Sequence, residues 1–416
     1  MNRPARRVAL YGYLASGNLG NDASLETVLA WFASAHPDVE LCAVTIAPDG
    51  LTQRYGIPAT PLAWAAPAWV PSPGGKVLGR LVDALRSLRL AGRVDAVVVP
   101  GMGVLEETIG VRPWGLPLWL FLTALACRAR GRSFVLLDVG ADRCVSRASR
   151  WLQVATARLA THVSVRDQRS ADSLVANGAE APLAVVPDLA FAHPATAGPS
   201  PEPGLLVVGV MAYYGVADDP VAGAAVRARY VDVLSAALAR LLDDGSRIVL
   251  VVGDQVDLDV AHQVERAVRT LRPTTPVDAV TLRPTTTFAE LTLQMARAEV
   301  VVASRFHNLV CALRLTRPTV SVGYAVKASD LMRAAGLADA VQEIDQLDAD
   351  ALVAQVRTAR RDGAVISAAL RETTRPWAGQ VGELLDRLAR ESLRLGPLSG
   401  APPTSTPTLA TPLTTR

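Results

Sequence analysis

The chain has 416 residues, of which 50% are hydrophobic and 19% are charged, and its net charge at pH 7 is +3. A chain this long predicts two domains, and its hydrophobic content excludes wholesale disorder. No dense basic stripe with interleaved aromatic residues occurs, which argues against a nucleic-acid-binding protein.

Lysine is rare, because only Lys76 and Lys327 are lysines among the 42 basic residues. Arginine is a planar fork and lysine is a compact point charge, so the two are not equivalent at a tight binding site. A lysine in such an arginine-rich chain is therefore a candidate for a specific binding role. The alternative is that the lysine occurs there by chance.

Nothing in the sequence predicts export or a membrane span. The four cysteines are far apart without a CxxC pair, which favours buried thiols in a reducing compartment over a zinc site or disulfides. The apolar run 8–15 is short and is better explained as a first strand than as a signal peptide. The most apolar stretch, 114–127, is too short to span a bilayer and predicts a buried helix. We therefore expect a cytoplasmic protein without a transmembrane segment.

Along the chain, short β-branched runs alternate with longer amphipathic segments, a pattern typical of parallel α/β architecture. In the first half we expect five strands, at 7–11, 39–46, 94–99, 133–139 and 162–166. We expect the intervening helices at 22–35, 76–92, 116–131, 146–160 and 168–177. A proline-rich segment within 193–204 then interrupts the pattern and predicts a linker.

The pattern restarts after this linker. We expect strands at 205–211, 247–252, 277–282, 299–303 and 319–322. We expect helices at 221–243, 258–271, 288–297, 308–315, 328–336, 349–360 and 377–393. The last residues are rich in proline, threonine and serine, which predicts disorder.

The expected organisation is thus two parallel-sheet α/β lobes joined by a hinge. The predicted limits are an N-terminal lobe at 1–195, a linker at 196–204, a C-terminal lobe at 205–396 and a disordered tail at 397–416. In parallel α/β folds, ligands bind beyond the carboxyl ends of the strands, which places the expected site between the lobes.

Two glycine-rich loops follow expected strands of the first lobe. Gly17, Asn18 and Gly20 open the first expected helix, and Gly101 and Gly103 follow the third strand. Glycines let the backbone approach a ligand, and a helix N-terminus favours an anion. Neither loop matches a dinucleotide or P-loop pattern. The structural alternatives are a tight turn with Asp22 as a helix cap and a strand end with two solvated carboxylates.

Two later segments carry the charged candidates. Arg166 and Asp167 end a strand and begin a helix, and Asp188 follows the next short strand. These residues fit either a structural ion pair with a helix cap or a ligand site.

The strongest segment begins where a buried strand ends, at Ser304, Arg305 and His307. Tyr324 and Lys327 follow the next strand. Arginine can bind a carboxylate or phosphate with two hydrogen bonds, and histidine can transfer a proton near neutral pH. We expect Arg, His and Lys to surround one spot suited to a small anion. The alternative for His307 is a structural histidine at a helix start.

These segments, in this order, resemble the polysaccharide pyruvyl transferase family over about residues 8–340. The matching motifs are a glycine loop (Gly17, Asn18, Gly20), an S-x-R-D segment (Ser164, Arg166, Asp167), a PD-x-AF segment (Asp188, Phe191), an S-R-x-H turn (Ser304, Arg305, His307) and a G-Y-x-x-K segment (Gly323, Tyr324, Lys327). One position departs from the pattern, because Asn21 stands where the family usually has aspartate and Asp22 follows it.

The resemblance implies two Rossmann-like lobes in a GT-B-like arrangement, phosphoenolpyruvate as donor substrate, and neither a cofactor nor a metal. The implied reaction forms a pyruvyl ketal on a sugar of a cell-surface polysaccharide or its precursor and releases phosphate. We expect His307 as general acid, Arg305 as catalytic anion ligand and Lys327 as a further ligand of the same anion. The other expected substrate-binding residues are Ser304, Tyr324, Arg166, Gly17, Asn18, Gly20, Asp22, Gly101 and Gly103. The general base stays open, with Asp22 or Glu26 as candidates.

Two other functions remain open at this point. One is a GT-B glycosyltransferase that uses a nucleotide-sugar, and the other is a non-catalytic glycan-binding protein. The acceptor sugar, and whether it is lipid-linked and requires a peripheral contact with the membrane, also stays open.

Overall fold

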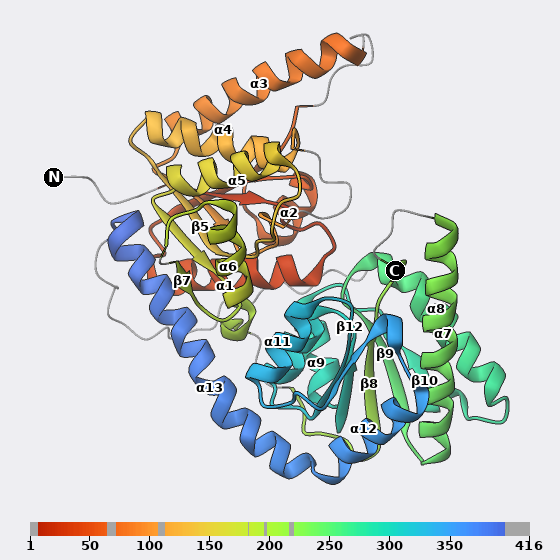
Figure 1. Ribbon diagram of the computed structural model, residues 1–416. Coiled ribbons are helices and arrows are strands. Elements are labelled where there is room, and N and C mark those ends of the chain that lie inside the picture. Colours follow the sequence, from red (N-terminus) through yellow and green to blue (C-terminus); the bar gives the residue numbers. More distant parts are fainter. Residues whose placement is uncertain are drawn as a thin grey trace.

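The computed structural model describes residues 7–64, 72–106, 113–181, 183–194, 198–215 and 220–395. These residues form two α/β lobes, each built on one parallel sheet (Figure 1). The tail predicted at 397–416 lies outside the described residues.

The N-terminal lobe contains a seven-stranded parallel sheet in the order β3-β2-β1-β4-β5-β6-β7. Its strands are β1 Arg7–Gly12, β2 Glu40–Thr45, β3 Ala59–Pro61, β4 Ala96–Pro100, β5 Ser133–Val139, β6 His162–Val165 and β7 Ala184–Val185. Its helices are α1 Leu19–Ala35, α2 Pro48–Tyr55, α3 Ser72–Arg93, α4 Leu116–Ala129, α5 Arg147–Leu159, α6 Gln168–Asn177 and the short 3-10 helix η1 Leu189–Ala192.

The C-terminal lobe contains a six-stranded parallel sheet in the order β10-β9-β8-β11-β12-β13. Its strands are β8 Leu205–Val210, β9 Arg247–Val252, β10 Val280–Leu282, β11 Val300–Ala303, β12 Thr319–Gly323 and β13 Val341–Glu343. Its helices are α7 Pro220–Asp243, α8 Leu258–Leu271, α9 Phe288–Ala296, α10 Phe306–Arg314, α11 Val326–Ala334, α12 Ala349–Arg361 and α13 Gly363–Leu388. Single turns lie at Gln255–Asp257, Val277–Ala279, Ile344–Gln346 and Ala389–Leu393.

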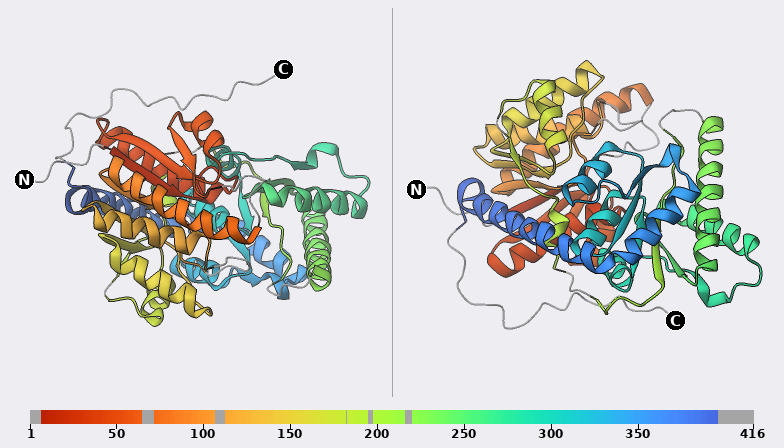
Figure 2. Two further views of the ribbon diagram at one scale, coloured as in Figure 1. Left: turned by 90° about the horizontal axis from the view of Figure 1, so that it is seen from above. Right: turned by 60° about the horizontal axis from the view of Figure 1, so that its bottom comes forward.

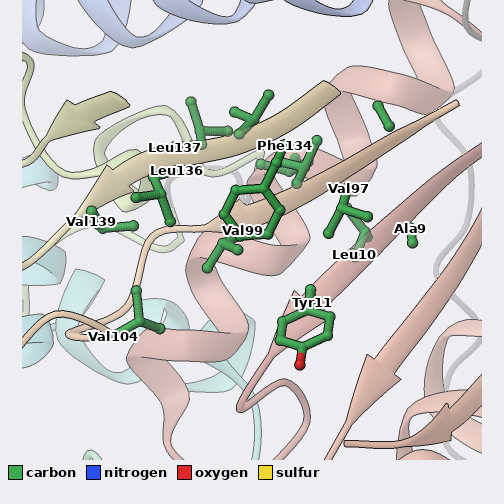
Figure 3. Close-up of a cluster of buried hydrophobic side chains, with 14 of the residues drawn as sticks. Ala9, Leu10, Tyr11, Val97, Val99, Val104, Phe134, Leu136, Leu137 and Val139 are labelled. Carbon is green, nitrogen blue, oxygen red and sulfur yellow. The ribbon is translucent and has the colours of Figure 1, made fainter. Parts of the chain in front are cut away.

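The central strands of each sheet are buried on both faces, as continuous apolar runs predict for parallel sheets. In the first lobe, side chains of β1, β4 and β5 pack together around Phe134, which is fully buried (Figure 3). In the second lobe, all residues of β8 and β11 are buried. Both sheets therefore provide rigid platforms for the loops at their strand ends.

The strand order reverses between β1 and β4 in the first sheet and between β8 and β11 in the second. In open parallel sheets this reversal separates the neighbouring loops at the carboxyl ends and creates the usual ligand position. The loops after β1, β4 and β11 are those that carry the expected glycine and Arg-His motifs.

The last long helix connects the two lobes. Helix α13 starts beside α12 in the second lobe and extends along the first lobe (Figures 1 and 2). Its residues Val381, Leu384, Leu385 and Leu388 belong to the apolar core of the first lobe. The sequence analysis assigned all of 205–396 to the C-terminal lobe and did not expect α13 to pack on the first lobe. The sequence indicates an amphipathic helix but does not show which core it covers.

Most expected elements are confirmed, and β5, α6, β9 and α8 have the expected bounds. Helix α2 and the short edge strands β3 and β13 were not expected, since three residues of strand give no periodic signal. The strand expected to end at Asp188 is β7, which ends earlier, at Val185. The last long helix begins at Gly363 rather than at the expected residue 377, and it contains Pro376. A proline is expected to start or end a helix, and here it does neither.

Candidate functional site

The first glycine loop lies against the second lobe. The amide of Asn18 donates to Asp254 Oδ2 over 2.9 Å, and the backbone amide of Leu19 donates to the carbonyl of Gly253 over 3.1 Å. Asn18 also caps α1, since its Oδ1 accepts from the amide of Gly20 over 3.1 Å. Gly17 has a φ of 90° and so uses a conformation that favours glycine. This loop therefore joins the lobes, and Asn18 is committed to that contact.

Gly20 makes room for the imidazole of His307. A Cβ atom at Gly20 would lie 1.8 Å from Nδ1, 2.2 Å from Cγ and 2.3 Å from Cε1 of His307. No side chain can occupy this position unless the ring moves. The two expected site residues, from different lobes, are thus brought into direct contact at the N-terminus of α1.

Five charged or titratable side chains gather around this contact, and we call them the inter-lobe cluster. Its members are Glu106, Arg166, Asp188, His307 and Lys327. Arg166 contacts Glu106 directly and lies 3.8 Å from Asp188. His307 Nε2 is 3.5 Å from Asp188 Oδ2, and Lys327 Nζ is 3.2 Å from Glu106 Oε2. The first lobe supplies Glu106, Arg166 and Asp188, and the second lobe supplies His307 and Lys327.

The electrostatics of this cluster keep its carboxylates charged. Burial opposes ionisation of Asp188, but His307 and Arg166 outweigh it and lower its pKa to about 2. Burial also opposes ionisation of Glu106, and the charges of Arg166 and Lys327 lower its pKa nonetheless. Asp188 is therefore an ionised carboxylate 3.5 Å from His307 Nε2, which makes no hydrogen bond in the structure.

Phe306 and two helix N-termini adjoin the same cluster. The ring centroid of Phe306 is 5.1 Å from the guanidinium carbon of Arg166 and 5.8 Å from Lys327 Nζ. Helices α10 and α11 begin here, and neither has a side-chain hydrogen bond at its N-cap. Uncapped helix N-termini direct partial positive charge and free amides toward an anion.

Arg305 is placed differently from His307. It donates from Nε to Asp257 Oδ2 over 2.9 Å and from Nη2 to Asp257 Oδ1 over 2.6 Å. Asp257 is fully buried and also accepts from the amide of Ala212. Arg305 is therefore held by a bidentate ion pair inside the second lobe, and this pair engages two of its five N–H donors. Asp257 was missed in the sequence because no motif links it to Arg305.

The remaining candidates of the second lobe have structural contacts. The Ser304 hydroxyl lies 3.0 Å from the Tyr230 hydroxyl in a buried pair. The Tyr324 side chain is about half exposed, and its ring lies beside Tyr213 with the centroids 5.7 Å apart. Tyr324 is thus accessible to a ligand, whereas Ser304 supports the turn from within.

The second glycine loop approaches the inter-lobe cluster. A Cβ atom at Gly103 would lie 2.5 Å from the carboxyl carbon of Glu106, and one at Gly101 would lie 2.5 Å from Ser24 Oγ. Gly101 also has a φ of 60°. These glycines permit close packing of the loop that presents Glu106.

Asp22 and Glu26 lie in a separate buried group, which we call the α1 cluster together with Arg54, Tyr55 and His193. Arg54 donates to Asp22 Oδ2 and to Glu26 Oε1, each over 2.9 Å. Glu26 also contacts the Tyr55 hydroxyl at 2.8 Å and His193 Nε2 at 2.7 Å. Asp22 has no exposed surface, and its Oδ1 accepts from the amide of Ala15. This burial disfavours a contact with a sugar and a role as general base.

Asp138 was also missed by the sequence analysis. It is the penultimate residue of β5 with a φ of 56°, is fully buried, and accepts from the amide of Leu189 over 2.8 Å. Burial and the nearby Asp188 raise its pKa well above the ordinary value. The sequence feature that could have identified Asp138 is a lone aspartate near the end of an apolar strand. Such a strained position occurs frequently near functional sites.

Two further features bear on what the site can hold. Among the described residues, no group of three or more His, Cys, Asp or Glu side chains could hold a metal ion. Within the same part of the chain, no helix combines the length and apolar character needed to cross a bilayer. A pocket beside the inter-lobe cluster reaches Glu106 and is lined by Val104, Leu105, Pro117, Leu120, Cys144, Ser149, Gln153 and Thr156.

Comparison with known proteins identifies a family and a fold. The model of the polysaccharide pyruvyl transferase family matches residues 18–325. No curated protein matches the sequence.

Several solved structures share the two-lobed fold. UDP-GlcNAc 2-epimerase from Neisseria meningitidis aligns with a TM-score of 0.60 at 10% identity, covering 93% of this chain and 99% of its own. A glycosyltransferase from Rickettsia africae aligns with a TM-score of 0.60 at 10% identity, covering 94% and 100%. UDP-GlcNAc 2-epimerase from Methanocaldococcus jannaschii aligns with a TM-score of 0.54 at 8% identity, covering 84% and 92%. At these identities the likeness establishes the GT-B-like fold alone.

Proposed function

The chain belongs to the polysaccharide pyruvyl transferase family, and we propose that it moves a pyruvyl group from phosphoenolpyruvate onto two hydroxyls of a sugar. The observation that carries this proposal is the inter-lobe cluster, in which His307 lies 3.5 Å from the ionised Asp188, and Arg166 lies 3.8 Å from the same carboxylate. A proton donor next to an anion site is the combination that this donor substrate requires.

The anion site is formed by Arg166 and Lys327, with Phe306 beside both. Phosphoenolpyruvate carries a carboxylate and a phosphate, and a guanidinium and an ammonium can bind one of these groups from two sides. The uncapped N-termini of α10 and α11 add amide donors to the same spot. We also propose that Arg305 binds the ligand anion through the N–H donors that Asp257 does not engage, while Asp257 fixes the orientation of the guanidinium.

The chemistry begins with a proton transfer from His307 to the methylene carbon of phosphoenolpyruvate. This step makes C2 electrophilic, and a sugar hydroxyl attacks C2 and loses its proton. A second hydroxyl then attacks C2, the bond between C2 and the phosphate oxygen breaks, and the proton of this hydroxyl leaves with the phosphate, so that the products are the ketal and inorganic phosphate. Asp188 holds the imidazole and stabilises its positive charge before the transfer, as carboxylates do beside catalytic histidines.

The acceptor is a sugar or glycan, in keeping with the family. We propose that it belongs to a cell-surface polysaccharide or its precursor and that the reaction takes place in the cytoplasm.

Phosphate release from phosphoenolpyruvate, measured across a panel of sugar acceptors, tests this function. We expect acceptor-dependent release by the wild type and its loss in His307→Ala, with the fold retained by circular dichroism. UDP-sugars serve as the competing donors, since UDP-GlcNAc 2-epimerase from Neisseria meningitidis, which shares the fold, was solved bound to UDP-GlcNAc. Turnover of a nucleotide-sugar without phosphoenolpyruvate activity would favour the glycosyltransferase alternative, and no turnover of either would favour a binding protein.

A further inference from the structure

Glu106 occupies the position in which a ligand anion would contact both lobes. Its carboxylate contacts the guanidinium of Arg166 on one side and Lys327 Nζ on the other, at 3.2 Å from Oε2 and 3.3 Å from Oε1. A carboxylate held between a guanidinium and an ammonium has the geometry that these cations offer to a substrate carboxylate or phosphate.

The two cations depend on Glu106 to different degrees. Arg166 is almost fully buried and has two further carboxylates nearby, Asp167 at 3.7 Å and Asp188 at 3.8 Å. Lys327 is paired with Glu106, and in the described part of the chain no other carboxylate lies within 4.0 Å of its ammonium. Departure of Glu106 would therefore leave Lys327 without a direct ion pair until another anion arrives, with Asp142 as a more distant negative charge.

Solvent can reach this position. The side chains of Glu106 and Lys327 are 18% and 20% exposed, whereas Arg166 is 3% exposed. Glu106 also lines a small neighbouring pocket. Glu106 belongs to the loop after β4, in which Gly103 leaves room for its side chain. The carboxylate can thus leave the two cations without unfolding a strand or helix.

We propose that Glu106 is an internal substitute for the substrate anion, which displaces it from Arg166 and Lys327 on binding. The inference deepens the proposed function and rests on it only for the identity of the anion as phosphoenolpyruvate. In the empty protein, Glu106 stabilises the two cations and joins the lobes. Binding then exchanges one carboxylate for another anion, and the freed Glu106 faces the neighbouring pocket.

Removal of the Glu106 charge should increase affinity for anions. An internal competitor lowers the apparent affinity, because a ligand can bind only during the fraction of time in which the site is free. We would measure binding of inorganic phosphate by isothermal titration calorimetry to the full chain and to Glu106→Gln. The expected result is a dissociation constant at least about tenfold lower in the variant. The double variant Glu106→Gln/Lys327→Gln should lose this gain.

A matched control separates local competition from net charge. Asp350→Asn removes the same charge from an exposed ion pair with Arg240, far along the chain in α12, and should leave phosphate affinity unchanged. Equal gains in Asp350→Asn and Glu106→Gln would overturn the proposal, because a general charge effect would then explain both.

Unchanged or weaker phosphate binding in Glu106→Gln would also overturn the proposal. Glu106 would then only form ion pairs that join the two lobes. If Glu106→Gln fails to fold, Glu106→Ala removes the same charge, and the absence of any gain there would be equally decisive. Phosphate binding needs no turnover. A gain in phosphate affinity without phosphoenolpyruvate turnover would therefore support this inference while refuting the proposed function.

Discussion

Replacement of Gly20 by alanine tests whether the position of His307 matters for function. The added Cβ atom would lie 1.8–2.3 Å from three ring atoms. Ordinary carbon contacts are about 3.5–4.0 Å, so the ring must move by about 1.5–2 Å. A displacement of about 1 Å at a catalytic group can cost about 100-fold in rate. We therefore expect kcat/KM for phosphoenolpyruvate to fall at least about 100-fold, or about 2.7 kcal/mol.

Stability should change much less than activity. Alanine improves helix propensity by about 1 kcal/mol, and overpacking costs about 1–3 kcal/mol. Gly379→Ala is the matched control, because this helical glycine in α13 has no atom within 4 Å of its added Cβ. That control should keep full activity. The double variant Gly20→Ala/His307→Ala should be no worse than His307→Ala alone, since both changes act on one group. Near-normal turnover in Gly20→Ala, with the fold intact, would refute the reasoning.

Two further predictions concern the buried ion pairs. Arg305→Lys cannot keep both hydrogen bonds to the fully buried Asp257, so urea denaturation should show a loss of about 1–3 kcal/mol. Arg357→Lys, in the exposed bidentate pair with Asp244, should leave stability almost unchanged. Equal effects would contradict the importance of burial. Burial raises the pKa of Asp22 from 3.8 to about 6, despite the opposing charge of Arg54. The protonated carboxyl is therefore favoured in the folded state, and this stabilisation is fully present below pH 3.8. It is lost as the pH rises through 6, which lowers the free energy of unfolding by about 3 kcal/mol. Asp22→Asn should flatten the change in unfolding free energy between pH 4 and 7, and an unchanged pH profile would contradict this assignment.

The sequence predicted the architecture well because parallel strands and amphipathic helices leave strong local patterns. It also singled out the turn at His307 and the cations Arg166 and Lys327 because they follow strand ends closely, and their roles stay predictions. It could not predict the partners of these groups. The ion pairs of Arg305 with Asp257 and of Lys327 with Glu106 join residues far apart in the chain, and no local pattern encodes them.

Asp22 shows the limit of reasoning from a motif. Its place in the glycine loop suggested a ligand contact, but the first turn of α1 directs it into a buried group with Arg54. Gly20 shows the opposite case, because its role depends on a histidine from the other lobe. The crossing of α13 onto the first lobe likewise required the three-dimensional arrangement.

The central claim is that His307 supplies the proton for pyruvyl transfer. The most direct test is phosphate release from phosphoenolpyruvate by the wild type and His307→Ala across a panel of sugar acceptors, with thermal unfolding measured in parallel. The account predicts acceptor-dependent release that the variant loses by at least about 100-fold, as expected for a general acid, while its unfolding temperature stays close to that of the wild type. Near-normal release by the folded variant would contradict the account.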